Sequence, residues 1–70
     1  METMVVSGGT LKNLRERRGW DRVTAAQHYG LTRRMVAALE QGTRQPSAIV
    51  AQRLAAVLGV ELDDILEVPA

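Results

Sequence analysis

The 70-residue sequence contains no cysteine, and aromatic residues make up only 3% of it. The absence of cysteine excludes disulfides, thiolate metal sites and cysteine nucleophiles, and it fits a reducing compartment. So few aromatic side chains also argue against a protein that binds single strands by stacking bases. No apolar run approaches the about 20 residues that span a bilayer, and no signal peptide is evident at the N-terminus. We therefore expect a cytoplasmic protein without a membrane segment.

Hydrophobic residues are plentiful, at 46% of the chain, and they are mainly leucine, valine, isoleucine and alanine. These residues build the cores of short packed helices. A chain of this length buries only about 60% of the surface of its unfolded state, so it forms one small domain. The composition therefore predicts a single all-α domain.

The net charge of +1 conceals an uneven distribution of charge along the chain. Residues 10–53 contain all nine basic side chains and three acidic ones, which gives this segment a charge of +6. Residues 54–70 contain four acidic side chains and no basic one. The first segment is a candidate for binding a polyanion, although a solvated helical surface would show the same excess.

Helix-capping residues and glycines divide the chain into short helical segments. The expected helices span residues 10–18, 21–29, 32–41 and 47–58, followed by a short one formed by Leu62, Ile65 and Leu66. The residues expected to cap the first four are Thr10, Asp21, Thr32 and Ser47. The sequence thus predicts a compact bundle of five short helices over residues 10–67.

Two short segments flank this predicted domain. Residues 1–9 show no helical period and end in two adjacent glycines, so we expect a flexible or extended N-terminal arm. Pro69 ends the helical pattern, and residues 68–70 are expected to form a C-terminal tail.

The residues around Gly30 are typical of two helices joined by a tight turn. Glycine adopts the positive φ of such a turn, Ala26 allows close approach of the helix axes, and Val36 can fix one helix on the other. From Leu11 to Leu66 the sequence resembles the helix-turn-helix domain of the Cro and phage-repressor type, the XRE-like family. The resemblance lies in LKNLRERRG, AAQHYGLTRRMVAALEQG, TRQPS and LAAVLGVELDDIL, which follow the family's order and spacing.

The resemblance implies a transcriptional regulator, expected to be a repressor, whose third helix lies in the major groove of double-stranded DNA. The positions that would contact bases are Thr32, Arg33, Arg34, Ala37 and Ala38. The positions that would contact phosphates are Arg22, Arg44 and Gln45. Arg22 departs from the glutamine usual in the family, and the departure adds a positive charge. The two alanines depart from polar residues, so they offer only apolar contacts, such as contacts with thymine methyl groups.

Arg33 and Arg34 are the preferred base-reading residues. The planar guanidinium group can donate two hydrogen bonds to guanine, and such a pair discriminates by about 1 to 3 kcal/mol. Two cations at a helix N-terminus oppose the helix macrodipole by about 0.3 to 1 kcal/mol each, and a bound polyanion would reverse that cost. This cost argues against the simpler interpretation that they are only solvated surface residues.

Other charged residues receive structural or unspecific roles. The family pairs the positions of Arg15 and Glu40, which fall near the buried faces of their helices, so the resemblance implies a structural ion pair. Arg17, Arg18 and Arg53 are expected to be general surface charge. The single histidine, His28, has no metal partner or nucleophile at a suitable spacing. We expect no cofactor, no metal, no small-molecule ligand and no enzymatic activity.

A domain this small contacts about four or five base pairs, so selective binding calls for a homodimer on DNA. Apolar residues that could form the dimer surface are Ile49, Val57, Leu62 and Val68. The main alternative is a protein-binding adaptor of the same fold, such as an antitoxin-like or anti-repressor partner. The charge of residues 10–53 favours DNA, whereas the apolar positions on the fourth helix favour a protein partner.

Overall fold

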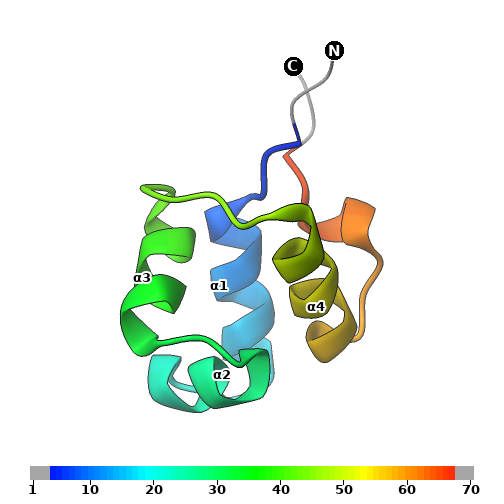
Figure 1. Cartoon of the computed structure of the whole chain (residues 1–70). Coiled ribbons are helices and arrows are strands. Elements are labelled where there is room, and N and C mark those ends of the chain that lie inside the picture. Colours follow the sequence, from blue (N-terminus) through cyan, green and yellow to red (C-terminus); the bar gives the residue numbers. More distant parts are fainter. Residues whose placement is uncertain (1–3, 68–70) are drawn as a thin grey trace.

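The computed structural model describes residues 4–67, and these residues form four α-helices and one 3-10 helix. The elements are α1 (Gly8–Arg17), α2 (Arg22–Tyr29), α3 (Arg33–Gln41), α4 (Ala48–Leu58) and the 3-10 helix η1 (Leu62–Ile65). In Figure 1, α2 lies below α1 and α3, and α4 lies to the right of α1. The predicted all-α bundle is confirmed, with its last element as a single 3-10 turn. Within the described residues, no helix is both long and apolar enough to cross a membrane.

Side-chain caps start α2, α3 and α4 where the sequence predicts them. Asp21, Thr32 and Ser47 each accept a hydrogen bond from the backbone N–H three residues further on. Such a cap satisfies one of the backbone donors that the first helical turn leaves free. The three helices end at Gly30, Gly42 and Gly59, which all have positive φ angles between 70° and 79°. Local sequence therefore determines the limits of these three helices.

The start of α1 differs from the prediction. Ser7 caps the helix by accepting from the N–H of Thr10 at 3.2 Å, so the expected Thr10 cap is wrong. Gly8, the first residue of the helix, lies against the C-terminal end of α3. A Cβ atom on Gly8 would come within 2.7 Å of the carbonyl oxygen of Leu39. The glycine allows a close helix contact, whereas we expected it to end the flexible or extended N-terminal arm.

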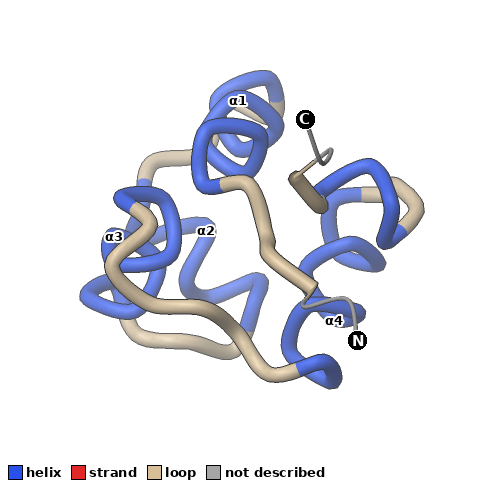
Figure 2. Tube along the Cα trace, turned by 90° about the horizontal axis from the view of Figure 1, so that it is seen from above, coloured by secondary structure: helices blue, strands red, loops and turns tan. Residues whose placement is uncertain are grey.

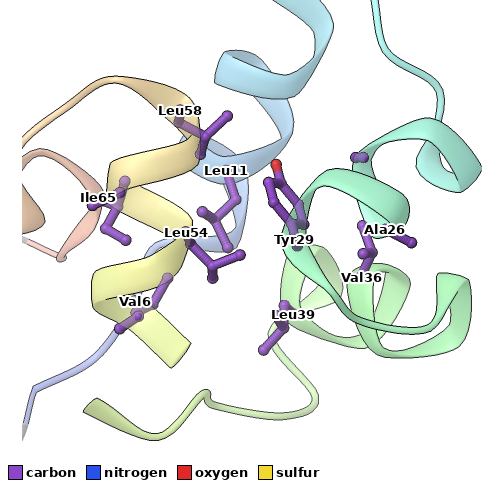
Figure 3. Packing of buried hydrophobic residues seen from close by; sticks show 12 residues of the cluster. Val6, Leu11, Ala26, Tyr29, Val36, Leu39, Leu54, Leu58 and Ile65 are labelled. Atoms are coloured by element: carbon purple, nitrogen blue, oxygen red, sulfur yellow. The ribbon is translucent and has the colours of Figure 1, made fainter. Parts of the chain in front are cut away.

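One hydrophobic cluster holds all the elements together (Figure 3). Helix α3 packs on α1 and α2, while α4 packs on α2 and η1. The buried members are Val6, Leu11, Ala25, Ala26, Tyr29, Val36, Leu39, Ala51, Leu54, Ala55, Leu58 and Ile65. Val6 was expected in the arm before the domain, yet it is 3% exposed and belongs to this core. Val68 and the rest of the predicted C-terminal tail lie outside the described residues.

The two aromatic residues lie together beside α2. Trp20 is half-buried and meets the buried Tyr29 edge to face, with ring centroids 6.3 Å apart. His28 stacks on Trp20 at 4.2 Å between centroids and 10° between ring planes. The tryptophan ring is therefore engaged in packing within the domain.

Candidate nucleic-acid interface

The α2–α3 unit positions the candidate interface. Gly30 ends α2 in the left-handed region, and Leu31 N–H donates to the carbonyl of Ala26 at 3.0 Å, which fixes the turn. Ala26 and Val36 then join the same buried cluster, at 5% and 1% exposure (Figure 3). Because α3 is held by its buried side, its opposite side faces solvent.

The exposed side of α3 contains the residues predicted to face DNA. Thr32, Arg33 and Arg34 are exposed, and Ala37 and Ala38 are half-buried. The Thr32 hydroxyl accepts from the N–H of Met35 at 3.0 Å, so its oxygen caps the helix while its hydrogen stays available as a donor. These five residues belong to α3 and its N-cap.

Arg33 and Arg34 occupy the first two positions of α3, where the helix dipole favours an anion. No hydrogen bond or ion pair joins either guanidinium group to another residue within 4–67. The first turn of α3 contains no acidic residue that would compensate them. The two arginines therefore form an uncompensated positive site at a helix N-terminus, which suits phosphate or the electronegative edge of guanine.

Gln41 is a further candidate that is absent from the predicted set. It is exposed and lies three and four residues after Ala38 and Ala37, which places it on the same side of α3. Its amide can donate and accept hydrogen bonds, which neither alanine can do. The helical spacing from Ala37 was sufficient to identify it.

Arg15 and Glu40 lie together as the family resemblance implies. The Nε of Arg15 donates to Glu40 Oε2 at 2.6 Å, and its Nη2 donates to Oε1 at 3.0 Å. The Nη1 of Arg15 donates to the carbonyl of Trp20 at 2.9 Å. The hydrogen bonds to Glu40 raise the pKa of Arg15 above its usual value. Both side chains are buried, so this pair fastens α1 to α3 and does not face a ligand.

Arg22 shares the same carboxylate. Its Nε donates to Glu40 Oε1 at 3.3 Å, while its side chain remains 39% exposed. The two terminal nitrogens of Arg22 have no hydrogen bond to other described residues, so they can still face a phosphate. No local pattern indicates this contact, because the two residues are 18 positions apart.

The loop between α3 and α4 contains two residues expected to contact phosphate. Within the described residues, one of the two side chains is free, and the other is hydrogen-bonded. Arg44 is exposed, and its side chain is bonded to no other residue of the described range. The amide of Gln45 instead accepts from Val6 N–H at 2.8 Å and donates to Val6 O at 3.4 Å. The side chain of Gln45 is therefore occupied within the protein.

Two of the three arginines assigned to general surface charge have specific partners. Arg18 Nη2 donates to the carbonyl of Leu58 at 2.7 Å, and Arg53 Nη1 donates to the carbonyl of Tyr29 at 3.4 Å. Each binds the last residue of another helix, where the helix dipole favours a cation. Only Arg17 of the three has no partner within 4–67.

The residues considered for a dimer surface differ in exposure. Ile49 is 73% exposed, whereas Val57 and Leu62 are half-buried and pack against the core. Val68 lies outside the described residues. Ile49 is thus the one large apolar side chain of this set that the described structure leaves open.

Comparisons with known proteins identify the family. The model of the helix-turn-helix family HTH_3 matches residues 11–65. The chain therefore belongs to the helix-turn-helix family. A comparison of the sequence with curated proteins found no match.

Among solved structures, the restriction-modification controller protein C.AhdI from Aeromonas hydrophila is 33% identical, with a TM-score of 0.75 over 81% of this chain and 83% of that chain. The hypothetical transcription factor NHTF from Neisseria is 27% identical, with a TM-score of 0.80 over 89% of this chain and 71% of that chain. The cobalt(II) form of HppE in complex with Tris buffer is 28% identical, with a TM-score of 0.80 over 94% of this chain but only 38% of that chain.

The match to HppE covers little more than a third of that chain, so it shows a shared fold and supports no activity here. The family and the regulators among similar structures support a DNA-binding transcriptional regulator.

Proposed function

We propose that this protein represses transcription by binding a specific double-stranded DNA sequence, with α3 in the major groove. The observation that carries the proposal is the pair of uncompensated arginines, Arg33 and Arg34, at the exposed N-terminus of a helix packed on α2 by its other side. A major groove about 12 Å wide accepts such a helix. A repressor role is consistent with this binding mode, because a protein seated in the groove excludes other proteins from the same site. It acts on the nucleoid, in the cytoplasm.

The chemistry of the α3 surface limits what it can recognise. Arg33 and Arg34 favour guanine, since each guanidinium can donate to both O6 and N7. Ala37 and Ala38 offer only apolar contact, as with thymine methyl groups, while Gln41 can add a hydrogen bond. Few residues therefore determine the sequence preference.

Arg22 and Arg44 hold the phosphate backbone on either side of the groove. Both present guanidinium nitrogens that no other described residue binds. Contacts with phosphate fix the register of the helix on DNA without reading its sequence. The acidic residues after Leu54 belong on the side away from DNA.

The protein binds as a twofold dimer on an inverted repeat. Support comes from Val57 and Leu62, which are apolar and half-buried at the end of α4 and in η1, whereas the exposed Ile49 lies at the start of α4. We place a weak interface at the end of α4 and η1. Phosphate would repel the acidic residues of this region, so the region faces away from DNA and is free to contact a second copy. Half-sites about 34 Å apart follow from the helical repeat of DNA.

Selection of bound duplexes from a random pool tests the proposal. We expect a guanine-containing inverted repeat, and an affinity that falls with log salt at about 0.9 per neutralised phosphate. Recovery of no motif, with binding that hardly responds to salt, would instead indicate the protein-binding adaptor.

A further inference from the structure

Val6 lies in a short stretch of extended backbone that pairs with the end of the described chain. The N–H of Ser7 donates to Ile65 O, and the N–H of Glu67 donates to Val5 O, both at 2.8 Å. These two bonds make Val6 and Leu66 an antiparallel bridge. In such a pair the N–H and C=O of Val6 point away from Leu66, toward the opposite edge.

The side chain of Gln45 binds this opposite edge. Its Oε1 accepts from Val6 N–H at 2.8 Å, and its Nε2 donates to Val6 O at 3.4 Å. A glutamine amide has the same donor and acceptor groups as a peptide, so it takes the place of a neighbouring strand. In Figure 2 the α3–α4 loop runs beside the segment that leads into α1.

The loop is also anchored just before Arg44. Thr43 N–H donates to the carbonyl of Ala38 at 3.1 Å, and its hydroxyl donates to the same oxygen at 3.3 Å. Arg44 is therefore a single residue between one anchor on α3 and another on Val6. Its guanidinium is exposed and bonded to no other described residue.

We propose that Gln45 is a positioning residue, which fixes the backbone of Arg44 so that its side chain meets a DNA phosphate. The assignment replaces the direct phosphate contact expected for Gln45, and it rests on the proposed DNA binding. A fixed loop helps because the backbone of Arg44 no longer has to be ordered when DNA binds. Without the side-chain amide of Gln45, Arg44 would keep its charge, but its backbone would no longer be held in the conformation that directs its side chain to the phosphate.

A double-mutant cycle on the full chain tests this role. Gln45→Met keeps the length of the side chain and removes the amide, and Arg44→Ala removes the guanidinium. The probe is a mixed-sequence duplex of about 30 base pairs at low salt, because phosphate contacts do not depend on sequence. Gln52→Met is the matched control, since Gln52 is exposed on α4 and bonded by its side chain to no other described residue.

We expect Arg44→Ala to weaken binding about tenfold and Gln45→Met about fivefold. When Arg44 is already alanine, Gln45→Met should change the affinity less than about twofold, because no guanidinium remains to be positioned. Exchange of the Val6 amide hydrogen should become about tenfold faster in Gln45→Met and stay unchanged in Gln52→Met.

An equal loss in both backgrounds would overturn the positioning role, since Gln45 would then act independently of Arg44. An unchanged affinity for Gln45→Met with Arg44 present, or unchanged exchange at Val6, would overturn it as well. Failure of the unmodified protein to bind any duplex would overturn the proposed function and this role with it. A failure confined to the cycle would leave DNA binding intact.

Discussion

The guanidinium group of Arg15 lies along the carboxylate of Glu40, with Nε 2.6 Å from Oε2 and Nη2 3.0 Å from Oε1. The side chains are only 8% and 3% exposed. A buried ion pair adds little stability compared with well-packed apolar residues in the same place. Loss of one partner, however, leaves a buried charge without a partner, which costs about 3 to 5 kcal/mol of folding stability. The pair therefore makes the α1–α3 contact sensitive to either residue.

Glu40→Ala should lower the free energy of unfolding by about 3 to 5 kcal/mol, because Arg15 would stay charged and buried without its partner. Denaturant unfolding measures the change. Arg22→Ala is the matched control, since Arg22 also binds Glu40 but is 39% exposed, and its loss should cost about 1 kcal/mol or less. An unchanged melting temperature for Glu40→Ala would contradict the account of this pair.

Arg18→Ala should destabilise the domain by about 1 kcal/mol, because it removes the hydrogen bond to the carbonyl of Leu58 at the end of α4. For a domain of this size that corresponds to a fall of about 4–8 °C in Tm. Arg17→Ala removes the adjacent exposed arginine, which has no partner within 4–67, and should leave Tm nearly unchanged. Calorimetry measures both Tm values. Equal falls in Tm for the two variants would show that the net charge, and not the hydrogen bond to Leu58, determines the effect of Arg18 on stability.

Tyr29→Phe should leave stability unchanged or raise it by up to about 1 kcal/mol. The hydroxyl of Tyr29 is buried without a hydrogen-bond partner among the described residues, so its removal relieves a desolvated polar group. Chemical denaturation at neutral pH measures this. A loss above about 1 kcal/mol would mean that the hydroxyl has a partner in solution.

Tyr29→Phe should also change how the stability of the fold depends on pH in alkali. Burial raises the pKa of Tyr29, so the fold favours the neutral phenol. The stability linked to this group is fully present below the pKa of the unfolded state, about 10, and is lost as pH rises toward the raised value. The unmodified protein should therefore lose more stability than Tyr29→Phe above about pH 10.

Asp21 should make the stability of the domain depend on pH in the acidic range, because it caps α2. Its Oδ1 accepts from the N–H of Thr24 at 2.7 Å, and this bond lowers the pKa of the carboxyl. A lowered pKa gives stability that is present above the unfolded value, near pH 4, and lost as pH falls through the lowered one. Asn can cap without titrating, so the Tm of Asp21→Asn should fall less steeply in acid. Asp63→Asn controls for the loss of one exposed carboxylate, and an identical acid response in both variants would contradict the role of the cap.

Local chemistry explains which parts of the fold were predictable. Asp21, Thr32 and Ser47 cap helices through contacts three residues away, so short sequence windows contain the whole interaction. The start of α1 was missed although Ser7 caps it through the same local contact, because two glycines follow the cap. Gly8 is needed there for its fit against Leu39, which depends on how α1 and α3 pack. The cap has a local signature, but the packing that requires glycine after it has none.

The candidate site shows the same division. The exposed position of Arg33 and Arg34 follows from the helical period of α3. The partners of Arg22 and Gln45 come from residues 18 and 39 positions away, and neither could be inferred from spacing. Residue type identified a basic surface, but only the folded chain shows which polar groups are already occupied.

The most direct test of the central claim is the ratio of affinities for a selected duplex and an unrelated duplex, measured for the unmodified protein, Arg33→Ala, Arg34→Ala and Arg22→Ala at one salt concentration. Loss of either α3 arginine should cost about 1 to 3 kcal/mol on the selected duplex and much less on the unrelated one, so the ratio collapses. Arg22→Ala should weaken both duplexes alike and preserve the ratio. Equal losses on both duplexes for Arg33→Ala and Arg34→Ala would contradict base reading and leave the pair as electrostatic contacts only.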